Sequence, residues 1–327
     1  MDPAATQPPS RPADPASLPG LEAGTRVRIV EVGARDGLQI EREILPPASK
    51  IALIRGLADA GLRCIEATSF VSPRWVPQLA DAEEVLRAVA DLGERGVELP
   101  VLVPNERGLE RALAAGARSI EVFTSATESF AMRNWNRDLA GVLAMAAPVA
   151  AAARADGLPV RGYLSMCWGD PWEGPTEPAR VAGIAAELLA MGCDSVSLGD
   201  TIGVATAGGV HRLLGAVTDA GIGLEQVGLH FHDTYGQAVS NVQAGLLAGV
   251  RTFDSSAGGM GGCPYAESAT GNLATEDLVW FLEGVGIDTG VDLPALARVS
   301  AEMAGQLGRP APSAVARALA PHGSTVR

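Results

Sequence analysis

The sequence is poor in lysine, histidine and cysteine, and the shortages of lysine and cysteine each argue against a class of site. Among its 327 residues Lys50 is the only lysine, and there are four histidines and four cysteines. The cysteines are scattered along the chain with no CxxC pair, which predicts free thiols rather than a disulfide framework or a structural zinc site. They are Cys64, Cys167, Cys193 and Cys263.

Basic clusters and long apolar runs are also missing. The net charge of −13 and the absence of a basic patch argue against a nucleic-acid partner. No apolar run reaches the roughly 18–20 residues that a membrane span needs, so no membrane association is expected. The N-terminus lacks the basic start and apolar stretch of a secretory signal, and we expect a cytoplasmic protein. Residues 1–24, rich in proline and alanine, predict a disordered tail, and residues 25–327 a single domain.

A regular alternation of short and long segments dominates the rest of the chain. Short β-branched runs are followed by alanine- and leucine-rich stretches of helical character, which indicates a parallel sheet. Eight such units favour a closed (β/α)₈ TIM barrel with extra C-terminal helices. An open doubly wound sheet is the alternative, although no GxGxxG turn follows the first strand. The expected strands are 26–33, 63–70, 99–105, 119–126, 159–166, 195–200, 226–233 and 251–258. The expected helices are 47–60, 78–92, 106–116, 138–155, 178–191, 207–220, 236–248, 274–286, 293–307 and 312–320.

Half of the histidines lie in one apolar run, "GLHFHDTYGQ" (228–237). Residues i and i+2 of a strand point to the same side, so His230 and His232 project together. In a barrel they would lie at the C-terminal end of strand seven, where barrel active sites are built. The alternative, two histidines that pack and bond locally, is less typical of an HxH pair at a strand end.

Other polar residues gather where predicted strands meet their loops. Strand one runs into "EVGARDGLQ", which supplies Arg35, Asp36 and Gln39, and strand six ends at Asp200. Glu66 lies inside the second strand, an unusual place for a carboxylate without a partner. Two imidazoles with a carboxylate, best supplied by Asp36, describe a site for Mg²⁺, Mn²⁺, Co²⁺ or Zn²⁺.

The single lysine narrows the chemistry of that site. Lys50 lies at the start of a helix, so Schiff-base catalysis in the barrel mouth is not expected. A lyase without such a lysine must stabilise a carbanion electrostatically, and Arg35 is the natural partner for an enolate oxygen. Cys263 lies in the glycine-rich "AGGMGGCPYA", and we interpret it as a catalytic thiol on a loop that closes over substrate.

With these motifs in hand, the chain resembles the 3-hydroxy-3-methylglutaryl-CoA lyases of the DRE-TIM metallolyase superfamily over roughly residues 26–320. The segments that carry the likeness are "VEVGARDGLQ", "EATSFVSPRWVPQLAD", "SLGDTIGV", "HFHDTYGQA", "GGMGGCPYA" and "GNLATEDLV". The resemblance implies an acyl-CoA thioester substrate, no organic cofactor and a homodimer. It also implies Mg²⁺ or Mn²⁺ held by Asp36, His230, His232 and Asn272.

The same resemblance implies catalytic roles. Arg35 would neutralise the enolate, Glu66 would support the metal site, and Asp200 and Cys263 would transfer protons. Gln39 would position Arg35 and, with Tyr163 of the fifth strand, would contact the substrate.

The chain departs from the family pattern after the fifth strand. Lyases of this type usually read close to "GCPYEG", whereas this chain has "WGDPWEG" (168–174), with Asp170 in place of a cysteine. The acyl group is therefore open, and a related 3-hydroxy-3-substituted acyl-CoA is an alternative substrate. A Claisen condensation synthase and a non-catalytic acyl-CoA-binding or metal-binding barrel are further alternatives. The intact RD and HxH motifs and the cysteine loop favour a lyase.

Overall fold

A parallel eight-stranded sheet forms the centre of the protein in a computed structural model, which describes residues 9, 11–12, 15–262 and 271–320. The strand order is β1-β10-β9-β8-β5-β4-β3-β2. From β10 back to β2, each strand pairs with the barrel strand that precedes it in the sequence, and β10 also pairs with β1. The strands are β1 (Arg28–Glu31), β2 (Thr68–Ser69), β3 (Val101–Leu102), β4 (Ile120–Ser125), β5 (Val160–Ser165), β8 (Ser195–Asp200), β9 (Val227–Phe231) and β10 (Thr252–Ser255). All eight lie within the strands that the sequence predicts.

The sheet closes between β1 and β2, the two strands at the ends of this order. Glu31 at the end of β1 forms a parallel bridge with Ile65, just before β2. The amide of Glu66 donates to the carbonyl of Glu31 at 2.8 Å, and the amide of Glu31 donates to that of Cys64 at 2.9 Å. The predicted TIM barrel is therefore confirmed, and the open doubly wound sheet is excluded.

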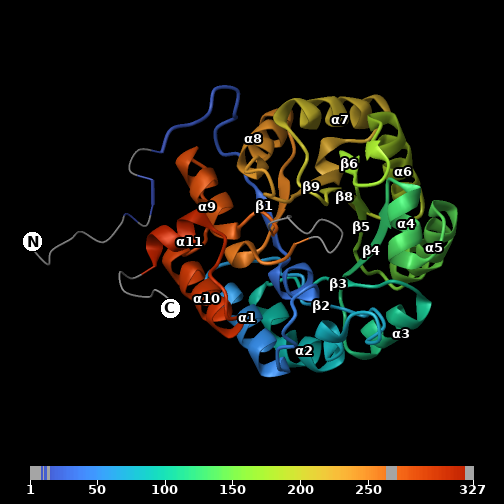
Figure 1. Cartoon of the computed structure of the whole chain (residues 1–327), viewed down its shortest axis with the longest axis horizontal. Helices are drawn as coiled ribbons and strands as arrows, with labels where there is room; N and C mark the ends of the chain where they lie inside the picture. Colours follow the sequence, from blue (N-terminus) through green and yellow to red (C-terminus); the bar gives the residue numbers. More distant parts are fainter. Residues whose placement is uncertain (1–8, 10, 13–14, 263–270, 321–327) are drawn as a thin grey trace, which may run out of the picture.

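Helices cover the outside of the barrel, as Figure 1 shows. Because both faces of the parallel sheet are buried, most strand residues are fully buried, and Ile120, Leu164 and Phe253 are among the largest. The surrounding helices are α1 (Pro47–Asp59), α2 (Ala82–Val89), α3 (Glu106–Ala114), α5 (Leu139–Ala155), α6 (Pro178–Ala190), α7 (Ala207–Asp219) and α8 (Ala238–Ala248).

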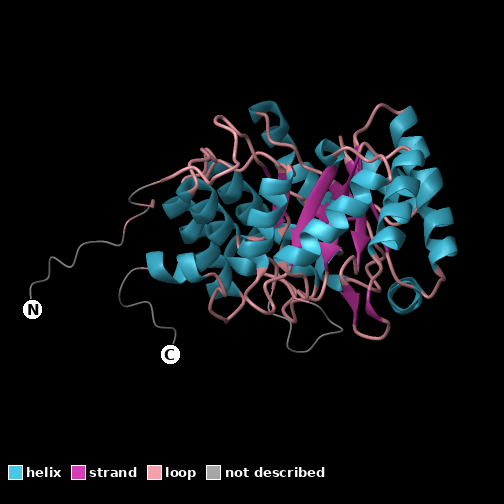
Figure 2. Ribbon diagram, turned by 90° about the horizontal axis from the view of Figure 1, so that it is seen from above, coloured by secondary structure: helices cyan, strands magenta, loops and turns pink. Residues whose placement is uncertain are grey.

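Three further helices follow the barrel and lie together at one side of it (Figures 1 and 2). They are α9 (Thr275–Gly284), α10 (Leu293–Gln306) and α11 (Ala314–Leu319), and they confirm the predicted C-terminal extension. Part of the N-terminal segment contacts them, because the amide of Ala16 donates to the carbonyl of Gly284 at 3.1 Å. The disorder predicted for residues 1–24, and the domain boundary there, stay predictions.

Two elements were not expected from the sequence. Helix α4 (Glu128–Trp135) precedes α5, and a small antiparallel hairpin of β6 (Gly169–Asp170) and β7 (Gly174–Pro175) follows β5. Both lie after the C-terminal ends of strands and therefore add to the active-site side of the barrel. Within the described ranges no single helix is long and apolar enough to cross a membrane; α4 and α5 pass that test only as a pair bent by 64°.

Candidate metal centre

The turn after β1 is a short π-helix, Gly33–Gly37, which carries Arg35 and Asp36. Single-turn π-helices are rare and are frequently found at functional sites. Glu31 fixes this turn, since its Oε1 accepts the amides of Gly33 at 2.8 Å and Ala257 at 2.9 Å. Burial raises the pKa of Glu31 to about 7, against the opposing effect of these hydrogen bonds.

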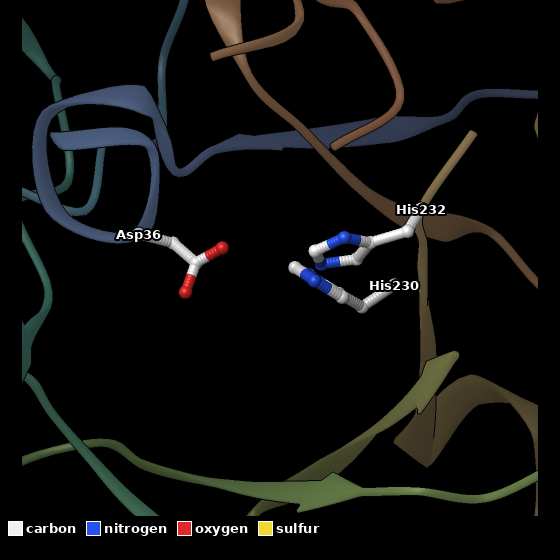
Figure 3. Close-up of side chains that lie close together, drawn as sticks. All are labelled: Asp36, His230 and His232. Atoms are coloured by element: carbon white, nitrogen blue, oxygen red, sulfur yellow. The ribbon is translucent and has the colours of Figure 1, made fainter. Parts of the chain in front are cut away.

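The two histidines come from the end of β9 and point the same way, as their spacing predicts. Figure 3 shows both rings facing the carboxylate of Asp36. One potential ligand atom from each of Asp36, His230 and His232 lies within 4.8 Å of the others. The two imidazole centroids are 5.3 Å apart. The sequence-predicted meeting of these three side chains is confirmed.

Asn272 reaches the same place from a segment that crosses the end of β9. It forms a bridge with His232, and the amide of the next residue, Leu273, donates to the carbonyl of Phe231 at 2.9 Å. The preceding residue must be glycine, because a Cβ atom at position 271 would lie 2.0 Å from the carbonyl oxygen of Gly259. The backbone contact thus fixes where the side chain of Asn272 begins.

The hydrogen bonds of Asn272 leave its side-chain oxygen available as a ligand for a cation. Its Nδ2 donates to Oδ2 of Asp36 at 2.8 Å and to the carbonyl of Met260 at 3.1 Å. Its Oδ1 is buried and has no hydrogen-bond partner within the described part of the chain. A buried oxygen of this kind costs free energy unless something satisfies it, and a hard divalent cation does so. The residues therefore fit a divalent metal with mixed nitrogen and oxygen ligands.

Arg35 is a buried cation held between two carboxylates. Its Nε donates to Oε1 of Glu66 and its Nη1 to Oδ1 of Asp36, both at 2.6 Å. Burial lowers the pKa of Arg35, but the charges of Glu66 and Asp36 outweigh it and raise that pKa well above its ordinary value. Burial likewise opposes ionisation of Asp36, yet Arg35 and the two histidines hold its pKa below the ordinary range.

Glu66 lies behind Arg35 in a fully buried position. Burial raises the pKa of Glu66 well above its ordinary value, and the neighbouring carboxyl of Glu121 raises it further against the effect of Arg35. Two neighbouring buried carboxyl groups favour a single shared negative charge. Glu66 contacts the site through the hydrogen bond from Arg35, and its support of the metal site stays a prediction.

Asp200 ends β8 and is 1% exposed. Its Oδ1 accepts the amide of Val204 and its Oδ2 that of Ala205, both at 2.9 Å. Burial raises the pKa of Asp200 to about 6, although these amides lower it. A carboxyl with that pKa exchanges protons near neutral pH, which suits a general acid or base.

The remaining predicted residues have different outcomes. Tyr163 faces the site: its ring is 6.1 Å from that of His230, and the guanidinium of Arg35 lies 5.4 Å from its centroid. Gln39 is half-buried just beyond the π-helix, and its contact with substrate stays a prediction. Cys263 lies outside the described residues, so its catalytic role also stays a prediction.

Sequence reasoning missed a second layer of charge beneath the histidines. It consists of Arg161, Asp254 and Glu121, all buried or nearly so inside barrel strands. The signal was available, because a charged residue inside a strand buried on both faces needs a partner. That argument singled out Glu66 and applies equally to these three positions.

The unusual hairpin after β5 has a local structural role. Oδ2 of Asp170 accepts the hydroxyl of Thr127 at 2.6 Å, and its Oδ1 accepts the amides of Trp172 at 2.7 Å and Glu173 at 3.0 Å. Trp172 in turn lies under the guanidinium of Arg133, 4.1 Å from the ring centroid. The carboxylate of Asp170 therefore ties β6 to the loop after β4.

Comparison with known proteins agrees with this architecture. The family model described as HMGL-like matches residues 26–303. A mitochondrial hydroxymethylglutaryl-CoA lyase of Arabidopsis thaliana is 49% identical over 90% of this chain, which spans 62% of that protein. A 3-hydroxy-3-isohexenylglutaryl-CoA/hydroxy-methylglutaryl-CoA lyase of Pseudomonas aeruginosa is 47% identical over 90% of this chain and 97% of its own length. The crystal structure of a Pseudomonas aeruginosa hydroxymethylglutaryl-CoA lyase has a TM-score of 0.88 at 46% identity and covers 92% of this chain and 99% of its own.

Proposed function

The chain belongs to the HMGL-like family, and on that premise we propose that it cleaves 3-hydroxy-3-methylglutaryl-CoA to acetoacetate and acetyl-CoA. The observation that carries this proposal is the meeting of Asp36, His230 and His232 beside the buried cation of Arg35 at the mouth of the barrel. That set supplies a cation site and a fixed positive charge, which are what an enolate-forming C–C cleavage needs.

A divalent metal, Mg²⁺ or Mn²⁺, would be held by Asp36, His230, His232 and Oδ1 of Asn272. When bound, such an ion polarises substrate oxygens and lowers the pKa of a hydroxyl group. Asp36 keeps its negative charge beside the permanently charged Arg35, so it is ready to bind a cation at neutral pH. The mixed nitrogen and oxygen set does not by itself choose between the two metals.

The chain's own residues then manage protons and charge. Asp200 accepts the proton of the tertiary hydroxyl group, and the electron pair of the adjacent C–C bond passes to the thioester as that bond breaks. Acetoacetate leaves, and the remaining product is the enolate of acetyl-CoA. Arg35, which stays protonated throughout, neutralises the enolate oxygen. Cys263 donates the proton that converts the enolate to acetyl-CoA.

The substituent on carbon 3 of the acyl group leaves room for a second candidate substrate. The altered hairpin after β5, anchored by Asp170, lies on the active-site side of the barrel. The name of the Pseudomonas aeruginosa relative includes an isohexenylglutaryl thioester, so a larger 3-substituent is compatible with this family. We propose the methyl-substituted thioester as the first substrate and a homologue with a larger 3-substituent as the second.

The test is to incubate the purified protein with hydroxymethylglutaryl-CoA and Mg²⁺ or Mn²⁺ and to measure acetoacetate and acetyl-CoA. We expect both products in equal amounts, none after chelation, and none with Asp36→Asn. Cleavage of only a 3-substituted homologue would select the second candidate. Condensation of acetyl-CoA with 2-oxo acids, without cleavage, would contradict both and identify a synthase.

Location and assembly are also proposals. The resemblance to the lyases suggests a homodimer, and the free thiols of Cys64, Cys167 and Cys193 suit a reducing compartment such as the cytoplasm. Light scattering of the purified chain measures its mass directly, and a single-chain mass near 33.5 kDa would contradict the dimer.

A further inference from the structure

Beneath the candidate metal centre, three residues that no sequence motif singled out form one connected arrangement. We propose that Asp254, Arg161 and Gly228 act as a positioning device that holds the ring of His230 with its second nitrogen directed at the metal site. This inference rests on the proposed metal-binding role of His230, and it adds what fixes that ligand.

Asp254 is the direct partner of His230. The two residues are paired in register across β10 and β9, so their side chains project to the same face of the sheet. Nδ1 of His230 lies 3.3 Å from Oδ2 of Asp254. Asp254 is fully buried and is not exposed to water that could replace this contact. A carboxylate that accepts from one ring nitrogen fixes the tautomer and leaves the other nitrogen free to bind a cation.

Arg161 reaches Asp254 from another part of the sheet and keeps it in place. It belongs to β5, which is separated from β10 by β8 and β9 in the sheet order. Its Nη2 donates to Oδ1 of Asp254 at 2.6 Å, and Ser197 donates to Oδ2 at 2.9 Å. The ion pair with Arg161 and the hydrogen bond from Ser197 hold the Asp254 carboxylate in place as an acceptor for His230.

Arg161 is itself fixed by its surroundings. Its Nη1 donates to the hydroxyl of Tyr163 at 3.1 Å and lies 3.7 Å from Oε1 of Glu121. Its guanidinium also lies 4.9 Å from the ring centroid of Tyr163. Tyr163 also contacts Arg35 and His230. Arg161 is therefore linked through Tyr163 to a proposed metal ligand, His230, and to Arg35, the cation proposed to neutralise the enolate.

The glycine at position 228 is independent evidence that the chain makes room for the contact between Arg161 and Asp254. It lies on β9 two residues before His230 and therefore faces the same interior. A Cβ atom at position 228 would lie 2.6 Å from Nη2 of Arg161, the same nitrogen that binds Asp254. Even alanine would therefore push the guanidinium away from the carboxylate. The glycine is explained by the space that the arginine needs, because its backbone is ordinary strand.

The test measures Mn²⁺ affinity of the whole chain by electron paramagnetic resonance of free Mn²⁺, without substrate. Asp254→Asn keeps the shape of the side chain but removes its charge, and Gly228→Ala displaces Arg161 without changing Asp254 or His230. We expect each to weaken Mn²⁺ binding by roughly 10- to 100-fold, the usual effect of losing a partner of a metal-bound histidine. The double variant should lose little more than the worse single variant, because both act through one path.

Ser255→Ala is the matched control. Ser255 lies next to Asp254 on β10, is equally buried, and its hydroxyl bonds to Thr275 on the other side of the strand. We expect it to retain wild-type Mn²⁺ affinity even where it lowers thermal stability. Conversely, folded Asp254→Asn and Gly228→Ala proteins that bind Mn²⁺ as tightly as wild type would overturn the positioning role. Wild-type protein that binds no Mn²⁺ would instead contradict the proposed metal centre itself.

Discussion

Individual side chains at the barrel mouth divide into groups that keep a fixed charge and groups that exchange protons. Arg35 and Asp36 hold each other ionised, whereas burial raises the pKa of Asp200 to about 6. Pairs of titratable groups whose surroundings push their pKa values apart mark acid–base assignments. These pKa directions favour electrostatic stabilisation as the role of Arg35 and proton transfer as the role of Asp200.

The pH dependence of turnover follows from the Asp200 assignment. As a base, Asp200 acts in its ionised form, which is lost as the pH falls through about 6. With metal and substrate saturating at each pH, we expect kcat to fall about tenfold per unit below that value. Asp200→Asn should lose roughly 10²- to 10⁴-fold in kcat and show no such inflection. A wild-type profile that is flat from pH 7 to pH 5 would refute this role.

A second prediction separates ligands from proton donors. His232→Ala removes a ligand, so we expect metal affinity to fall together with turnover. Cys263→Ser should lower turnover by orders of magnitude and leave metal affinity nearly unchanged, because the thiol is proposed to act only on protons. Calorimetric metal titration of both variants checks this contrast. Equal loss of metal in the cysteine variant would show that the thiol has been given the wrong role.

Single residues also show how far sequence reasoning reaches. The HxH pair and Asp36 were predictable because strand alternation and barrel topology bring them to one rim. Asn272 was found only through the family resemblance, since it reaches the site by a crossing segment that no local period marks. Arg161 and Asp254 lie on strands separated by two others, and only the three-dimensional sheet reveals that they touch.

At the scale of elements, the eight strands were predictable and their exact lengths were not. β2 and β3 have two residues each, because paired backbone groups next to them belong to isolated bridges such as Glu31 with Ile65. Helix α4 was missed since its eight residues, "ESFAMRNW", are too few to show a clear helical period. The β6–β7 hairpin is shorter still, and Asp170 stabilises it by accepting two amides of its own turn and the hydroxyl of Thr127 from outside it.

The hairpin supplies a prediction at this scale. Asp170 accepts three hydrogen bonds from buried or partly buried donors, those of Thr127, Trp172 and Glu173. Asp170→Ala leaves these donors without their acceptor and should lower the free energy of unfolding by about 2–4 kcal/mol. Asp170→Asn keeps an acceptor and serves as the control, with a smaller loss. Denaturant unfolding measures both, and equal stabilities of the alanine variant and wild type would contradict the anchoring role.

At the scale of the whole molecule, buried carboxyl groups couple stability to pH. Glu276 at the start of α9 is fully buried, accepts from the hydroxyl of Ser300 and from the amide of Gly258, and burial raises its pKa to about 7. An ordinary glutamate pKa of about 4.5 applies after unfolding. The folded state therefore binds the proton more tightly, so this contribution is complete below pH 4.5 and is lost as the pH rises to 7.

Glu276→Gln tests this coupling. The wild type should lose on the order of 3 kcal/mol of stability from this group between pH 4.5 and pH 7, and the glutamine variant should not. The difference between the two free energies of unfolding, measured across that range, isolates the contribution of Glu276. A difference that stays constant with pH would contradict the raised pKa of this buried carboxyl group.

The fold as a whole explains why distant parts of the sequence serve one site. Asp36 and Asn272 are 236 residues apart, yet a hydrogen bond of 2.8 Å joins them because β1 pairs with β10 in the barrel. The class of fold and the rim at which the site lies follow from strand–helix alternation and the positions of polar residues. The supporting layer beneath the histidines depends on closure and could be seen only in three dimensions.

The most direct measurement of the central claim is anomalous diffraction from a crystal of the protein soaked with Mn²⁺. We predict one strong peak at the rim, within bonding distance of Asp36, His230, His232 and Oδ1 of Asn272. A peak elsewhere, or a fully soaked crystal with no density between these four side chains, would contradict the metal centre and the cleavage mechanism that depends on it.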